Sequence, residues 1–226
     1  MTTPLPDFTS PTLFPIFTTC PLTEDPPPPH PDPYYLLGTI TENMTLTPVT
    51  PTFICKDRDG HAFAVTLKLT SRQSGEGSAP ASGDGNFYES PRGRKAFGKG
   101  KCVVVPMARR KGAREENAEL GRKEKKGFIE GLWRDGSESG SDGEGIFVLP
   151  TGLMNLIEIG ERRRKEEGKK SCQGCGKSEE EVEGMVRCKG CESVWYCGKA
   201  CQVLGWSKKG HKCECKVLRA VKDIFL

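Results

Sequence analysis

Seven cysteines and one histidine in the last quarter of the chain have the types and spacing of metal ligands. They form four pairs: Cys-x2-Cys twice, then Cys-x3-Cys and His-x3-Cys. A Cys-x2-Cys pair on a tight turn aims two thiolates at one ion, and residues four apart share one face of a helical turn. Eight ligands fill two tetrahedral sites, and zinc sites closed by four protein ligands are structural rather than catalytic. The ligands are Cys172, Cys175, Cys188, Cys191, Cys197, Cys201, His211 and Cys215.

The redox compartment decides between metal ligation and disulfides for this cluster. Eight of the 11 cysteines lie between Cys172 and Cys215. The first residues lack a basic region and are interrupted by prolines, so we expect no secretory signal. No apolar run reaches the roughly 18 residues that span a bilayer. We therefore expect a cytoplasmic or nuclear protein, in which thiols stay reduced and a dense cysteine cluster binds metal.

Residues 172–215 resemble the MYND-type zinc finger. The resemblance rests on Tyr196-Cys197, Cys201-Gln202, Trp206 and the final His-x3-Cys. One departure is the stretch of four residues between Trp206 and His211, where family members usually have two or three. Another is Cys213, which could compete with Cys215, although the His-x3-Cys spacing favours Cys215.

The resemblance implies two interleaved structural zinc ions in a cross-braced finger, built from a short β-hairpin and short helices. Spacing alone does not choose between this pairing and a sequential one. The resemblance assigns Cys172, Cys175, Cys197 and Cys201 to the first zinc, and Cys188, Cys191, His211 and Cys215 to the second.

Composition divides the rest of the chain. Residues 1–51 hold 13 of the 17 prolines and are expected to form a disordered arm rich in Pro and Thr. Residues 52–160 predict a small β-rich domain, whose polar and glycine-rich stretches predict disordered insertions at 71–93, 108–126 and 134–145. Residues 161–171 are expected to be a charged linker, and the apolar spacing of 216–226 predicts a C-terminal helix.

The β-rich domain is predicted from alternation and turn signals. Residues 53–55 lead into the turn Asp57-Arg58-Asp59-Gly60, and residues 63–69 then alternate apolar and polar, which predicts a hairpin. Further strands are expected at 102–105, 127–129 and 146–149, and a short helix at 153–159.

A role in protein–protein interaction follows from the resemblance, because MYND fingers as a family bind proline-containing peptides and bridge regulatory proteins. The residues offer a physical basis for an adaptor of this kind. Residues 193–196 are expected to form an exposed edge strand that accepts an extended peptide by strand addition. The predicted peptide-binding residues are Val194, Trp195, Gln202 and Trp206, although the two tryptophans could instead pack the finger's core.

The chain itself contains a candidate ligand for this groove. Residues 11–15 have the form Pro-x-Leu-x-Pro, so an intramolecular contact between them and the finger is one expectation.

The sequence bears on two other classes of function, nucleic-acid binding and catalysis. The basic tracts 94–126 and 162–170 could bind nucleic acid weakly, but closed thiolate sites make the finger itself net acidic, which disfavours phosphate. Some MYND fingers are embedded in lysine methyltransferases that carry a SET domain. Residues 52–160 are short for one and contain no motif of its cofactor loops. We therefore expect no catalytic residues and no enzyme.

Overall fold

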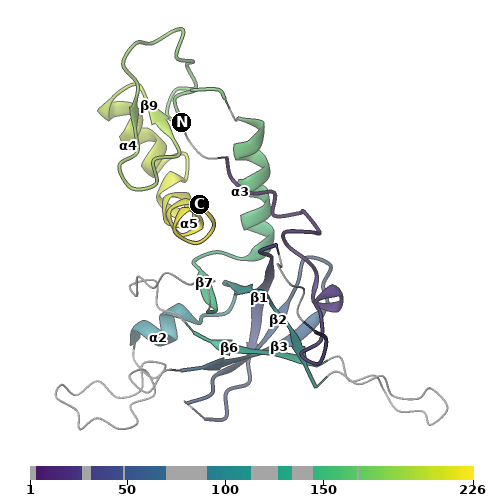
Figure 1. Cartoon of the computed structure of the whole chain (residues 1–226). Coiled ribbons are helices and arrows are strands. Elements are labelled where there is room, and N and C mark those ends of the chain that lie inside the picture. Colours follow the sequence, from purple (N-terminus) through teal and green to yellow (C-terminus); the bar gives the residue numbers. More distant parts are fainter. Residues whose placement is uncertain are drawn as a thin grey trace. The chain divides into compact units, whose positions relative to one another are not determined.

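The structure, a computed structural model, describes residues 4–26, 32–47, 49–69, 91–112, 127–133, 145–166 and 168–226. The chain divides into two compact units (Figure 1). We call Thr9–Met154 the β unit, and Met1–Phe8 together with Asn155–Leu226 the finger unit. Among the helices of the described ranges, none is both long and apolar enough to cross a bilayer.

A seven-stranded mixed sheet forms the β unit, in the order β5-β6-β3-β2-β1-β4-β7. Neighbouring strands are antiparallel except β3 and β6, which are parallel. A 3-10 helix, η1 (Phe17–Thr19), and a short helix, α2 (Pro91–Ala96), accompany the sheet. The strands are β1 (Tyr35–Asn43), β2 (Thr52–Lys56), β3 (Ala62–Lys68), β4 (Cys102–Pro106), β5 (Arg110–Lys111), β6 (Phe128–Leu132) and β7 (Phe147–Leu149).

The hairpin predicted around the Asp-Gly turn is confirmed as β2 and β3. Its turn is held by the buried carboxylate of Asp57, which accepts the backbone N–H groups of His61 at 2.8 Å and Asp59 at 3.1 Å. The second oxygen of Asp57 accepts the N–H of Phe17 at 2.9 Å. One buried carboxylate thus closes the hairpin and anchors η1 beside it.

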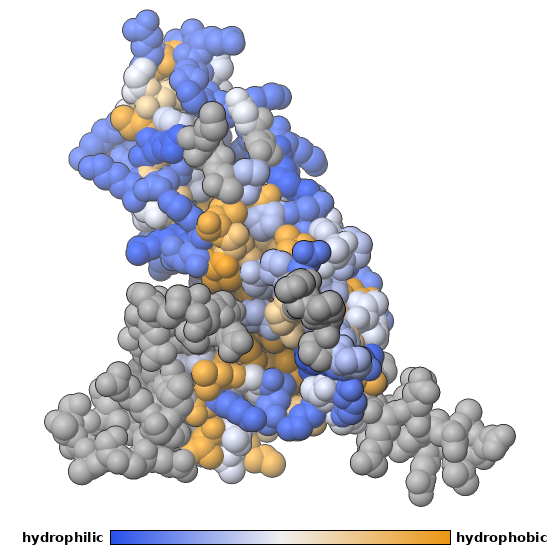
Figure 2. All heavy atoms as spheres, viewed as in Figure 1, coloured by the Kyte–Doolittle hydropathy of each residue, from blue (hydrophilic) through white to orange (hydrophobic). Residues whose placement is uncertain are grey.

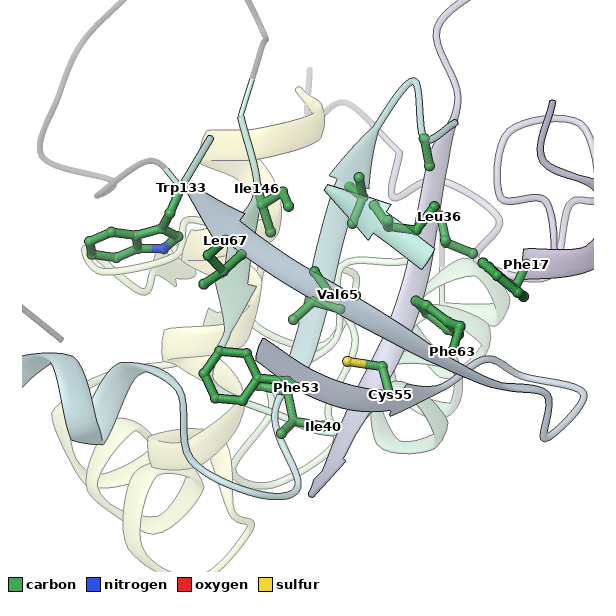
Figure 3. Packing of buried hydrophobic residues seen from close by; sticks show 14 of the residues in the cluster. Phe17, Leu36, Ile40, Phe53, Cys55, Phe63, Val65, Leu67, Trp133 and Ile146 are labelled. Carbon is green, nitrogen blue, oxygen red and sulfur yellow. The ribbon is translucent and has the colours of Figure 1, made fainter. Parts of the chain in front are cut away.

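The core of the β unit lies where the inward side chains of β3 meet those of its neighbours (Figure 3). Phe63, Val65 and Leu67 alternate inward along β3, as the sequence pattern predicts. Phe17 stacks on Phe63 with ring centroids 4.8 Å apart. A β-rich unit is therefore present, although it spans Thr9–Met154 rather than 52–160, and the strands expected at 102–105, 127–129 and 146–149 correspond to β4, β6 and β7.

The expectation of a disordered arm at 1–51 is wrong for most of it. Strand β1 lies in this stretch, between β2 and β4 in the sheet, and Phe14 and Phe17 are buried. The Leu13 carbonyl accepts the N–H of Tyr35 at 2.8 Å, so residues 11–15 are engaged within the β unit and are not a free ligand. The aromatic residues between the prolines supply apolar area that an average composition hides.

The predicted insertions 71–93, 108–126 and 134–145 lie largely outside the described residues. Two parts of them are described and are ordered. Helix α2 begins inside the first, and β5 lies inside the second, where Arg110 pairs with Ile129 of β6. For the remainder, the insertions stay a prediction.

The finger unit contains three helices and one two-stranded sheet. The helices are α3 (Leu153–Lys165), whose first two residues belong to the β unit, α4 (Lys199–Ser207) and α5 (His211–Phe225). The strands are β8 (Val186–Arg187) and β9 (Trp195–Tyr196). The helix predicted at 153–159 is present and continues through Lys165. The predicted C-terminal helix is the second half of α5.

Residues 161–171 are not simply the charged linker that the sequence suggests. Arg163 is 9% exposed, and its guanidinium donates to Glu166 at 3.0 Å, Gln173 at 3.1 Å and Glu214 at 2.9 Å. These bonds tie the end of α3 to the finger and to α5. The face of this unit seen in Figure 2 is covered chiefly by hydrophilic residues.

Candidate metal centre

Two groups of four ligands come together in the finger unit. Within each group the candidate ligand atoms all lie within 4.8 Å of one another. The groups interleave along the chain, so the pairing implied by the family resemblance is confirmed and a sequential pairing is excluded. The first group is Cys172, Cys175, Cys197 and Cys201, and the second is Cys188, Cys191, His211 and Cys215.

Local structure explains how each pair is presented. The two Cys-x2-Cys pairs lie on turns outside the helices. Cys201 lies in the first turn of α4, and Cys197 lies four residues before it, directly after β9. His211 and Cys215 are one turn apart at the start of α5, so their side chains share one face.

The distances fit tetrahedral zinc. A Zn–S bond of about 2.3 Å places two ligand sulfurs of a tetrahedron about 3.8 Å apart. The sulfurs of Cys188 and Cys215 are 3.8 Å apart, and those of Cys175 and Cys197 are 3.5 Å apart. The Cys191 sulfur lies 3.6 Å from Nε2 of His211. Both donor sets are therefore complete, with no position for substrate or reactive water.

Backbone N–H groups prepare the first site for a metal. Partial burial raises the pKa of the Cys172 thiol, but N–H donors from Cys175, Cys197 and Gly174 outweigh it and lower the pKa to about 6. The N–H groups of Cys175 and Cys197 lie 3.5 and 3.4 Å from the Cys172 sulfur. A thiolate is the form that binds zinc.

His211 is prepared by burial instead. Its side chain is fully buried, and this burial, with a smaller contribution from Arg163, lowers its pKa. The imidazole is therefore neutral and keeps a lone pair for the metal. Nε2 faces the Cys191 thiol, whereas Nδ1 is buried without a hydrogen-bond partner in the described structure.

The two sites differ in their exposure to solvent. All four ligands of the second site are buried, whereas in the first site Cys175 is exposed and Cys197 and Cys201 are half-buried. Tyr196 and Trp206 both meet the His211 ring edge-on, at centroid distances of 6.0 and 5.8 Å. The second site is thus part of the small core of this unit.

Residues 172–215 match the family model of the MYND finger. This segment is a MYND finger. The two sites fit the two zinc ions of such a finger, and MYND fingers mediate protein–protein interaction. A histone-lysine N-methyltransferase from Arabidopsis thaliana is 43% identical over 47 residues. That match covers 21% of this chain and 8% of the relative, so the likeness is confined to the MYND finger. No solved structure matches the chain.

The four cysteines outside the two ligand groups differ in exposure. Cys213 is exposed on α5 and belongs to neither ligand group, so Cys215 is the ligand. Cys20, Cys55 and Cys102 are buried in the β unit. Burial raises the pKa of Cys20 and of Cys102 to about 12, and it also raises that of Cys55. These three thiols stay protonated and unreactive.

The structure does not assemble the four predicted peptide-binding residues into one groove. Val194 is 2% exposed. Tyr196 contacts α4, since a Cβ on Gly205 would lie 2.6 Å from the Tyr196 ring. Successive strand residues face opposite sides, so Trp195 faces away from α4. This alternation within two residues is the detail that the sequence interpretation missed.

The expectation of a free strand edge at 193–196 is wrong at Trp195. One side of β9 pairs with β8, with Arg187 opposite Trp195. On the other side the Trp195 carbonyl accepts the N–H of Gln173 at 2.8 Å. Neither side of Trp195 is open to an added strand.

Gln202 and Trp206 remain together on α4, one turn apart. Trp206 is 39% exposed, although one edge of its ring contacts His211. Trp206 therefore packs against a metal ligand and also presents an aromatic surface to solvent, and its role in peptide binding stays a prediction.

Proposed function

We propose that the MYND finger docks extended, proline-containing peptides of protein partners on the face of α4 that carries Gln202 and Trp206. The observation that carries the proposal is the exposure of Trp206, a large aromatic side chain held in place by the second metal centre. Val203 and Leu204, its neighbours on α4, are 58% and 40% exposed. Apolar side chains gathered on one short helix favour a docking role.

The side chains on this face of α4 suit the binding of a peptide rather than the catalysis of a reaction. An aromatic wall packs against proline rings, and an amide one turn away can donate to and accept from an extended backbone. Because Trp206 is fixed by its contact with His211, little side-chain entropy is lost when a peptide binds. Closed zinc sites supply no open coordination position, so the proposal gives the finger a binding role and no catalytic one.

A titration of the full-length, zinc-loaded protein with a Pro-x-Leu-x-Pro peptide tests the proposal. Anchoring aromatics at interfaces contribute about 2 kcal/mol or more, so Trp206→Ala should weaken binding about thirtyfold. Val186→Ala, which truncates an exposed apolar side chain on β8 outside α4, is the matched control and should change affinity little. Equal binding by wild type and Trp206→Ala would remove this face from the account.

A further inference from the structure

A pocket of about 530 Å³ lies on a different part of the finger unit. It is bounded by Pro4 and Leu5, by the end of α3 with the residues after it, and by the stretch from Glu192 to Trp195. Neither Gln202 nor Trp206 lines it. The proposed peptide face on α4 and this pocket are therefore separate sites.

Trp195 forms the aromatic part of the pocket and is flanked by two cations. The guanidinium carbon of Arg187 lies 4.4 Å from the ring centroid, and the Lys170 ammonium lies 5.5 Å from it. Both are within the range of cation–π attraction, which holds the cations over the ring. Trp195 is thus a platform that presents positive charge.

The lining is strongly unbalanced in charge, with six basic and two acidic residues. Most of the basic residues come from segments outside residues 172–215, so the pocket is basic even though the MYND finger carries anionic zinc sites. The basic lining residues are Arg163, Arg164, Lys169, Lys170, Arg187 and Lys222.

Several of these cations already have a carboxylate partner. Lys170 pairs with Glu179 at 2.6 Å, and Lys222 pairs with Glu192. Among the described residues, Lys169 and Arg187 have no ion pair. Both line the pocket, and Arg187 also lies over the Trp195 ring, so two lining cations are left for a ligand that brings negative charge.

The chain's own N-terminal segment shows what chemistry this part of the unit accepts. Asp7 pairs with Arg164 at 2.6 Å. Phe8 is buried and meets Phe225 edge-on at 5.8 Å, over Gly160, where a Cβ would lie 2.6 Å from the Phe8 ring. Pro4 and Leu5 line the pocket, and the acidic Asp7 and the aromatic Phe8 dock beside it.

We propose that this pocket is a second docking site of the finger unit, which takes an extended acidic segment of a protein partner. A carboxylate of the partner pairs with Lys169 and Arg187, and an apolar neighbour packs between Leu5 and Trp195. The other cations of the pocket already form ion pairs with carboxylates of the chain. A partner that supplies a carboxylate to Lys169 and Arg187 is therefore selected by charge complementarity.

Two labelled peptides titrated into the full-length, zinc-loaded protein test this inference. One alternates glutamate with proline and leucine, and the other has glutamine in place of every glutamate. The glutamate peptide should bind more tightly, and Lys169→Gln with Arg187→Gln should weaken it about tenfold, since partly exposed ion pairs contribute up to about 1 kcal/mol each. Lys208→Gln with Lys209→Gln, an equal loss of charge outside the pocket, is the matched control.

A cross-over separates this site from the one on α4. Trp206→Ala should leave the glutamate peptide bound, and the Lys169/Arg187 variant should leave the Pro-x-Leu-x-Pro peptide bound. Zinc content checks that each variant is folded. Arg187 is next to a zinc ligand, so if the double variant does not fold, Lys169→Gln alone is compared with the wild type. The inference fails if the glutamine peptide binds equally, or if the control variant loses as much. It also fails if single-stranded DNA or an anionic vesicle binds Lys169 and Arg187 more tightly than the peptide.

Discussion

Gly205 is the residue that lets α4 lie against the core of the MYND finger. A Cβ at this position would lie 2.6 Å from the Tyr196 ring, which is fully buried next to the second zinc site. Neither partner can move freely, because Tyr196 packs against His211 and α4 carries the first-site ligand Cys201.

We predict that Gly205→Ala destabilises the finger unit by about 1–3 kcal/mol, the usual cost of overpacking. Thermal unfolding monitored by the fluorescence of the finger's tryptophans measures it. Gly198→Ser is the matched control, because a Cβ there meets nothing within 4 Å and serine is a favoured residue at a helix start. Similar losses in both variants would contradict the packing argument.

Zinc binding and burial determine which cysteines can react. Zinc protects seven thiols, and burial keeps Cys20, Cys55 and Cys102 protonated, with the pKa of Cys20 and Cys102 near 12. Only the exposed Cys213 is left among the cysteines. We predict that iodoacetamide at mildly alkaline pH modifies the native zinc protein once, at Cys213, as located by mass spectrometry. Modification of a β-unit cysteine at a similar rate would show that the β unit opens readily.

Helices α3 and α5 are joined by arginine–carboxylate pairs on Glu214. Arg163 is 9% exposed and donates to three partners, whereas Arg162 is 48% exposed and pairs with Glu214 alone, at 2.6 Å. The two neighbours share one carboxylate and differ in burial. We expect the buried Arg163 to contribute more to stability than Arg162, because exposed ion pairs contribute little.

We predict that Arg163→Met lowers the free energy of unfolding of the finger unit by about 1–3 kcal/mol, since it removes the hydrogen bonds that a largely buried guanidinium donates to Glu166, Gln173 and Glu214. Arg162→Met removes the same chemistry from the surface and should cost about 0.5 kcal/mol or less. Urea unfolding of both variants provides the comparison. An equal cost would mean that the buried network is not what joins α3 to α5.

Which elements could be predicted from the sequence follows from how local their causes are. The hairpin β2–β3 and the ligand pairs of the MYND finger were predictable because a turn or a helical repeat fixes them within a few residues. Strand β1 was not, because it lies in a proline-rich stretch and one of its two partners, β4, is far along the chain. The opposite facing of Trp195 and Tyr196 depends on the phase of a two-residue strand, which no pattern that short defines.

The pocket beside Trp195 lay beyond sequence reasoning for a related reason. Its walls come from Leu5, the end of α3 and Arg187, which only the folded unit brings together. The basic tract 162–170 is the one visible signal, and in the sequence it indicates only weak binding of nucleic acid. In the folded unit its arginines form ion pairs with Asp7, Glu166 and Glu214.

The two units of the molecule are stabilised by different physics. The β unit has its own apolar core of aromatic and branched side chains. The finger unit buries fewer such residues and depends on metal as well, whose coupled binding and folding energy is on the order of 10 kcal/mol or more in small zinc domains. Removal of zinc should therefore unfold one unit and spare the other.

We predict that a chelator collapses the indole N–H signals of Trp195 and Trp206 in the nuclear magnetic resonance spectrum and leaves that of Trp133, buried in the β unit, in place. Returned zinc should restore both lost signals. Loss of the Trp133 signal at the same chelator concentration would contradict the separate stabilisation of the two units.

Two closed, interleaved zinc sites are the central feature of the finger unit, and metal analysis of the purified chain measures them most directly. We predict two zinc ions per chain in the wild type. Cys172→Ala and Cys188→Ala each remove a ligand from a different site, so each variant should lose one ion first. The more exposed first site should also yield its zinc to a chelator before the buried second site. One zinc ion per wild-type chain, or loss of the same ion in both variants, would contradict the two-site structure.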